Sequence, residues 1–326
     1  MTAPRRSAGE LAPATEAVEP RSAPVRRTAG REWSTLGALA LTSFVLNVED
    51  TAIAVALPTL ARDLGLGLSA LEWVVNAYTV AIAGLLLAGG RMADVLGTRR
   101  VLLGGVALLT GASLVAGLAA SGAVLIGARA AQGAGAALIL PATLAIVVTV
   151  FTERRRGVAL GIYAGAGAAA LALGPLVGAV VSEALGWRWI FLLNVPLGIL
   201  GFLAVALALP KRARRHRRAG MDIPGLTLGA VGLLLLVFAL SAGGRYGWTS
   251  IPVTALFAGS ALALVLFGQV ERRGKAPLIT PGTFRSRRTA GANAAMLLST
   301  SVMCSVFFFV SLYLQTVAGY SPLSAG

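Results

Sequence analysis

Three ionisable residues lie inside apolar stretches of this sequence, where charge is rare. Arg129 lies within the apolar run 123–148, and Glu49 and Asp50 lie within the run 36–57. A charge at the centre of a bilayer costs roughly 2.5–3.5 kcal/mol on insertion scales, so such residues face a partner or a wet cavity. Burial favours the neutral form of a carboxyl group, and a nearby cation favours the ionised form. These residues are therefore candidates for proton exchange.

Asp50 and Arg129 are expected to lie at the same depth. Asp50 precedes Leu57, the outer end of its run, by seven residues, and Arg129 follows Ala123, the outer end of its own, by six. At 1.5 Å per residue both lie roughly 9–10 Å below the outer boundary, so they can pair if their helices are neighbours. Glu49 is about 100° around the helix from Asp50, so the two carboxylates are not expected to point the same way. A static pair that only joins two helices is the alternative to proton exchange.

Other polar residues within the apolar runs are candidate cavity or substrate contacts: Asn47, Asn76, Tyr78 and Gln132. Gln132 and Gly133 follow Arg129 by three and four positions, so they share its helical face. This polar face with little side-chain bulk is expected to line a pathway. Tyr78 is equally typical of an aromatic residue at the membrane interface.

The composition excludes an ordinary water-soluble domain. The chain has 326 residues, of which 56% are hydrophobic and 13% charged, and its mean hydropathy is +0.80. Soluble domains carry about 25% charged residues. The sequence contains one cysteine, so no disulfide can form within the chain. It shows no metal-ligand cluster, nucleotide-binding loop or catalytic triad, so we expect no enzyme activity, metal or cofactor.

The sequence predicts an all-α, polytopic membrane protein, because a spanning helix needs about 20 apolar residues. Nine apolar runs meet this length: 36–57, 72–90, 100–120, 123–148, 157–181, 189–209, 223–242, 250–270 and 291–314. We expect a disordered cytoplasmic tail, a six-helix bundle, a basic loop, two further helices, a second basic loop and one last helix, over residues 1–34, 35–209, 210–222, 223–270, 271–290 and 291–326 respectively.

The basic residues follow a one-sided pattern. The net charge is +15, and 24 of the 28 Lys and Arg residues lie in the tail or in the loops after the even-numbered runs. Cytoplasmic loops are enriched in Lys and Arg, so the N-terminus is expected in the cytoplasm of a cell-membrane protein. The bilayer explains the basic charge without nucleic acid. The basic stretch in 210–222 fits a lipid-facing loop, with a specific lipid or regulator site as the alternative.

Two glycine-containing segments are candidates for mechanical roles. The first is expected to be a cytoplasmic loop between the second and third runs, with Gly90, Asp94, Gly97, Arg99 and Arg100 as its notable residues. Glycine permits turns, and an aspartate can cap a helix or hold the arginines. In the fifth run, proline favours a kink and the glycines allow close helix contact, the residues being Gly174, Pro175 and Gly178.

These segments together resemble the major facilitator superfamily, and more narrowly its 14-helix drug:proton antiporter branch. The similar segments are 50–58 in the first helix, 90–100 in the loop motif, 129–135 in the fourth helix, 174–178 in the fifth, 187–198 at the start of the sixth and 313–322 at the end of the ninth. The chain departs from the motifs at Met92, Thr98, Ala170 and Ala179.

The resemblance implies two inverted three-helix repeats, a linker pair and the first helix of a second bundle that is incomplete here. It also implies that the loop motif and the fifth-helix glycine face meet that second bundle. The implied function is proton-coupled export of drugs or other amphipathic small molecules, with Asp50 or Glu49 exchanging protons and Arg129 tuning them. The truncated chain is expected not to transport alone. Metabolite transport without proton antiport and a non-transporting membrane fragment are the alternatives.

Overall fold

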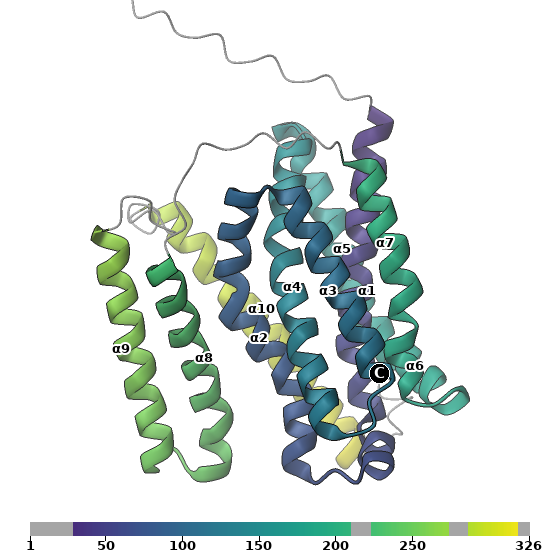
Figure 1. The fold of residues 1–326 in the computed structure, drawn as a ribbon, viewed down its shortest axis with the longest axis vertical. Coiled ribbons are helices and arrows are strands. Elements are labelled where there is room, and N and C mark those ends of the chain that lie inside the picture. The colour runs from purple at the N-terminus through teal and green to yellow at the C-terminus, as the bar shows by residue number, and fades with distance from the viewer. Residues whose placement is uncertain (1–28, 210–222, 274–285, 319–326) are drawn as a thin grey trace, which may run out of the picture.

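The computed structural model describes residues 29–209, 223–273 and 286–318 (Figure 1). The regular structure in these residues is helical throughout: α1 (Ala29–Leu64), α2 (Leu68–Leu96), α3 (Thr98–Gly117), α4 (Gly122–Val150), α5 (Glu153–Ala184), α6 (Arg188–Leu192), α7 (Asn194–Ala208), α8 (Ile223–Tyr246), α9 (Ile251–Arg273) and α10 (Arg287–Thr316). The all-α prediction is confirmed for this part of the chain.

Eight helical segments among the described residues are long and apolar enough to cross a membrane, with α6 and α7 counted as one. The break between α6 and α7 falls at Leu193. Pro196 has no backbone N–H to donate to the carbonyl of Leu192, which explains the interruption of the single helix expected there. The ninth apolar run is the helix α10; it is not among the eight segments, and some of its side chains lie outside the described residues.

Helices α1–α7 form one bundle, and α8 and α9 form a hairpin beside it (Figure 1). Within the bundle α2 packs on α4, α1 packs on α5, and α3 packs on α4 and α7. The hairpin contacts the bundle through α8, which lies along α2. There the rings of Trp73 and Phe238 are 4.8 Å apart between centroids. The hairpin therefore extends the bundle on the α2 side.

The bundle interior consists of two apolar clusters with a polar layer between them. One cluster contains Leu39 and Leu46 of α1 with Val106 of α3 and Ile139 of α4, among others. The other cluster contains Ile53 and Leu60 of α1 with Leu125 of α4 and residues of α6. Helices α1 and α4 therefore contribute to both clusters, with one cluster before the middle of each helix and the other after it. The expected ionisable residues lie between the two clusters.

Several predicted boundaries are wrong. Helix α1 begins at Ala29, so residues 29–34 are helical and not part of a tail. The segment 90–100 is not a loop: Gly90 and Asp94 lie in α2, Arg99 and Arg100 lie in α3, and Gly97 alone separates the helices. Gly97 has a φ of 94°, which glycine adopts without strain. The expected tail up to residue 28 and the basic loop 210–222 lie outside the described residues.

The basic ends of the described helices gather at one end of the bundle. The start of α1, the ends of α2, α4 and α7, and the starts of α3 and α5 meet there (Figure 1). At this end Arg155 of α5 lies 3.8 Å from Glu32 of α1. The arrangement favours the predicted orientation, which itself stays a prediction.

Candidate functional site

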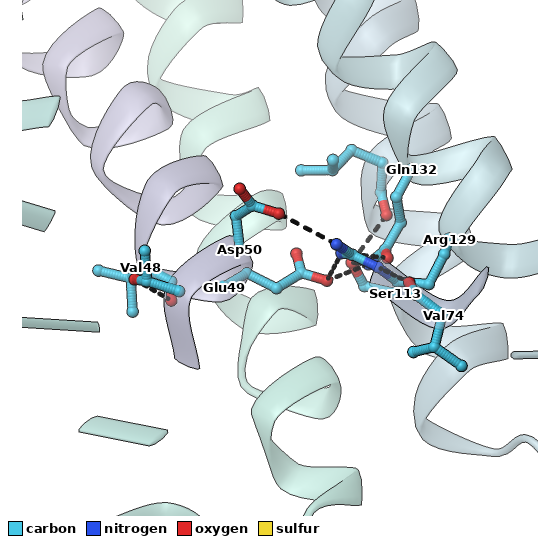
Figure 2. Close-up of polar contacts among 9 residues, drawn as sticks. Val48, Glu49, Asp50, Val74, Ser113, Arg129 and Gln132 are labelled. Atoms are coloured by element: carbon cyan, nitrogen blue, oxygen red, sulfur yellow. Dashed lines mark hydrogen bonds and ion pairs between the residues drawn. The ribbon is translucent and has the colours of Figure 1, made fainter. Parts of the chain in front are cut away.

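Arg129 of α4 is enclosed at the centre of the polar layer. Its side chain is fully buried, and its guanidinium group donates three hydrogen bonds to three helices. Nε donates to the backbone carbonyl of Val74 on α2 at 3.1 Å, one terminal nitrogen donates to Gln132 at 3.3 Å, and the other donates to Asp50 at 3.1 Å (Figure 2). The charge is thus compensated inside the protein, as the unfavourable burial of an unpaired charge requires.

The Asp50–Arg129 pair expected from equal helical depth is confirmed by this geometry. Glu49 is also close, with its Oε1 3.6 Å from the terminal nitrogen of Arg129 that donates to Gln132. The expectation that the two carboxylates point in different directions is confirmed, yet both reach the same guanidinium group. The guanidinium group is a fork of several donors, so carboxylates that approach from different directions each meet a nitrogen of their own.

The two carboxylates differ in their exposure. The side chain of Glu49 is 2% exposed, whereas that of Asp50 is 38% exposed. Figure 2 shows both carboxylates reaching the guanidinium group from α1, with Glu49 directed to Arg129 and Gln132 and Asp50 approaching from another direction. Asp50 therefore presents a carboxylate that is both paired with a buried cation and accessible.

Gln132 lies inside the cluster and not on the wall of a cavity. It is fully buried, donates to Glu49 and to Ser113 of α3, and accepts from Arg129. Its spacing of three residues from Arg129 brings the two side chains together, as expected. Because both ends of its amide are engaged, the predicted pathway face of α4 is a packed contact with α1, α2 and α3.

The other three cavity candidates lie in different places and do not line one common cavity wall. The buried Tyr78 places its ring under the guanidinium group, 4.3 Å from centroid to Cζ, so it belongs to the cluster. Asn76 lies between Val74 and Tyr78 in the sequence, so it points to another side of α2. Asn47 lies one turn before the acids and donates to the carbonyl of Ser43 at 2.7 Å.

The fifth-helix glycines pack against α1 beside the two acids. A Cβ atom on Gly178 would lie 2.5 Å from the carbonyl oxygen of Ala52, and one on Gly174 would lie 2.9 Å from that of Val48. The predicted close helix contact is therefore present. Its partner is α1 of the same bundle, whereas the resemblance implies the second bundle. Pro175 lies inside α5 next to this contact.

The residues of the 90–100 segment act at the end of the bundle. Arg99 donates to the carbonyl oxygens of Ala206 and Leu209 at 2.9 and 3.0 Å, which joins the start of α3 to the end of α7. Asp94 is exposed, and no side chain caps the start of α3. The predicted capping role of Asp94 is therefore wrong. Arg100 is exposed, and Gly90 lies within α2.

Sequence reasoning missed two features. Ser113 and the carbonyl of Val74 complete the buried cluster, but a lone serine and a backbone atom give no sequence signal. At the end of the bundle opposite the basic helix ends, the Trp187 indole donates to Asp63 at 3.0 Å, and Arg188 lies 3.7 Å from the same carboxylate oxygen. In the described part of the chain no group of three or more metal-ligating side chains is placed to hold a metal ion.

The geometry defines a buried cation that holds two carboxylates between four helices. Comparison with known families now places the chain: the model of the major facilitator superfamily matches residues 39–326. The chain belongs to the major facilitator superfamily. It is a multi-span membrane protein.

Several curated relatives are named for antibiotic export or resistance. The chain is 46% identical to the cephamycin export protein of Amycolatopsis lactamdurans over 88% of its length, and 37% identical to the puromycin resistance protein of Streptomyces alboniger over 96%. It spans 60% and 62% of those two proteins respectively. A crystal structure of a peptide transporter is similar in fold, with a TM-score of 0.59, 19% identity, and coverage of 89% of this chain and 64% of that one.

Proposed function

We propose that this chain provides the proton-exchange part of an exporter for drugs or other amphipathic small molecules. The observation that carries the proposal is Asp50, an accessible carboxylate that is paired with the fully buried Arg129. The names of the relatives support export of antibiotics as the activity of the complete carrier. Because the chain spans about three fifths of those relatives, the activity is proposed for the complete carrier.

The charge of the cluster supports exchange of a single proton. With Glu49, Asp50 and Arg129 all ionised, the cluster carries one net negative charge. A net charge is unfavourable in a low-dielectric surrounding, and one proton on a carboxylate removes it. Asp50 is the carboxylate that a proton reaches most directly, since Glu49 is enclosed by Arg129 and Gln132. We therefore assign the exchange to Asp50, and to Glu49 the role of an enclosed partner of Arg129 and Gln132.

The cluster also supports a coupling to helix movement. The α5 glycines contact α1 at Val48 and Ala52, on either side of the two acids. A change in the charge of Asp50 alters its attraction to Arg129, and hence the force between α1 and α4. Since α5 follows α1 through the close contact, protonation acts on three helices together.

The proposal is tested with proteoliposomes that carry a pH gradient. Two proteins are compared: the 326-residue chain, and a chimera in which it is joined to the portion of the cephamycin export protein beyond the aligned region. We expect gradient-driven movement of an antibiotic or dye in the chimera, and none in the shorter chain. Asp50→Asn should abolish the dependence on the gradient, whereas Asp63→Asn, which changes a carboxylate at the outer end, should preserve it.

Two outcomes favour the alternatives. Transport by the chimera that ignores the pH gradient indicates a transporter without proton antiport. Absence of transport in a folded chimera indicates a non-transporting membrane protein. Either result overturns the proposal, and so does a chimera with Asp50→Asn that still responds to the gradient.

A further inference from the structure

The buried cluster around Arg129 contains one side chain, that of Ser113 on α3, which carries no charge and contacts no charged group among the described residues. Its side chain is fully buried within an apolar stretch of α3. Its hydroxyl donates to the carbonyl of Leu109 at 2.9 Å and accepts from Nε2 of Gln132 at 2.8 Å. A buried hydroxyl that bonds in both directions is placed to impose an orientation on its neighbour.

The hydroxyl fixes which end of the Gln132 amide faces the acids. Because the Ser113 proton is directed to Leu109, its oxygen can only accept, so the neighbouring amide atom has to be the nitrogen. Arg129 imposes the same orientation from the other side, since a guanidinium group only donates and therefore meets the amide oxygen. The second N–H of Gln132 is consequently directed to Glu49.

We propose that Ser113 is a positioning residue that acts through Gln132 to keep Glu49 ionised. An N–H that is held against a carboxylate stabilises its charged form, and a reversed amide would present an oxygen and favour the protonated form. With Glu49 kept charged, the exchangeable proton is left to Asp50. This inference deepens the proposed function and rests on it for its significance, although the protonation of Glu49 is measurable without transport.

The surroundings of Glu49 contain few other groups that influence its charge. Arg129 of α4 and Asp50 of α1 are the charged neighbours, and Tyr78 of α2 is the titratable one. The membrane-embedded parts of the other packed helices carry no charged residue: 157–182 of α5, 101–117 of α3, and α6–α7 after Arg188. Tyr163 is the titratable residue of that part of α5. The N–H of Gln132 is thus an uncharged group in contact with Glu49, and its position can be changed by substitution without altering the charge of the cluster.

The test follows the protonation of Glu49 in the folded 326-residue chain in lipid nanodiscs. Infrared difference spectra over a pH series report the carbonyl stretch of protonated carboxyl groups, and Glu49→Gln identifies the band of Glu49. We expect Ser113→Ala to move the midpoint of this band upward by about half to one pH unit, less than the roughly one to two units that complete loss of a hydrogen bond to a charged group would give. Ser113→Cys keeps a weak acceptor in a similar volume, so it should move the midpoint by less in the same direction.

Thr110 offers a matched control on the same helix. It donates to the carbonyl of Val106 at 2.7 Å but packs against Gly198 of α7, away from Gln132. Thr110→Ala should leave the midpoint unchanged. In a Gln132→Ala background, Ser113→Ala should add no further shift, because the group through which it acts is gone.

Three results overturn the inference. They are an unchanged midpoint in both Ser113 variants, an equal shift in Thr110→Ala, and an additive shift in the double variant with Gln132→Ala. These results leave the proposed function intact, because gradient-driven transport in the chimera is a separate measurement. Conversely, the expected shift in a protein that fails to transport supports the positioning role and counts against the exporter.

Discussion

Replacing Arg129 with methionine should reveal how strongly the cluster depends on its cation. The substitution keeps an unbranched, apolar side chain but removes the hydrogen bonds to Val74 and Gln132 and both ion pairs. Glu49, which is 2% exposed, then keeps only the N–H of Gln132. Removing one partner of a buried ion pair costs about 3–5 kcal/mol, because it leaves an uncompensated charge. We expect Arg129→Met to lower the free energy of unfolding by this amount at neutral pH.

A second substitution in the Arg129→Met variant tests the contribution of each carboxylate separately. Adding Glu49→Gln removes the uncompensated buried charge, so it should recover most of the lost stability. Adding Asp50→Asn should recover less than about 1 kcal/mol, because the 38% exposed carboxylate is already partly solvated. In Arg129→Met alone the folded state disfavours the Glu49 carboxylate, so it binds a proton more tightly than the unfolded state. The loss of stability should therefore shrink as the pH falls.

The measurement is reversible unfolding in mixed micelles by sodium dodecyl sulfate, followed by tryptophan fluorescence at several pH values. Wild-type stability in Arg129→Met at neutral pH would refute the reasoning. So would equal rescue by Glu49→Gln and Asp50→Asn, because the structure assigns the two carboxylates very different burial.

Three further predictions use the same unfolding measurement. Gly178→Ala should lower the free energy of unfolding by about 1–3 kcal/mol, because its Cβ would meet the α1 backbone. Gly161→Ala, whose Cβ meets nothing within 4 Å, should be neutral or slightly stabilising. Equal effects of the two substitutions would contradict the close α1–α5 contact. Arg99→Ala should cost about 1–2 kcal/mol through two lost bonds to the end of α7, and Arg100→Ala, on an exposed side chain, should cost almost nothing. Trp187→Phe should cost about 1–2 kcal/mol because its indole hydrogen bond to α1 is lost, and an unchanged midpoint would show that the bond is irrelevant.

The sequence was sufficient to predict the Asp50–Arg129 pair because helical rise converts residue counts into depth. Both residues lie in uninterrupted apolar runs, so the count from each outer end was reliable. The same reasoning could not place Glu49, since angular position on a helix does not give the reach of a side chain. A guanidinium group with several donors accepted both carboxylates.

Other errors arose where hydropathy and secondary structure differ. The polar character of the segment 90–100 favours a loop, but α2 continues beyond its apolar run to Leu96 and α3 begins at Thr98, directly after Gly97. Gln132 was expected to face a cavity because it is polar and close to small residues. It is buried because α3 packs beside α4 there and Ser113 accepts from its amide, and the sequence alone does not reveal this packing.

The cross-helix cluster has a consequence for biogenesis. The apolar run of α1 carries two acids and that of α4 carries the cation, and each helix inserted singly would expose an unpaired charge to lipid. The ribosome completes α1 long before α4, so the acids of α1 are present for some time before Arg129 has been synthesised. We expect α1 to remain beside the insertion machinery until α4 emerges, which site-specific crosslinking of nascent chains of increasing length would detect. Early release of α1 into lipid, before Arg129 has been synthesised, would show that the acids tolerate the bilayer without it.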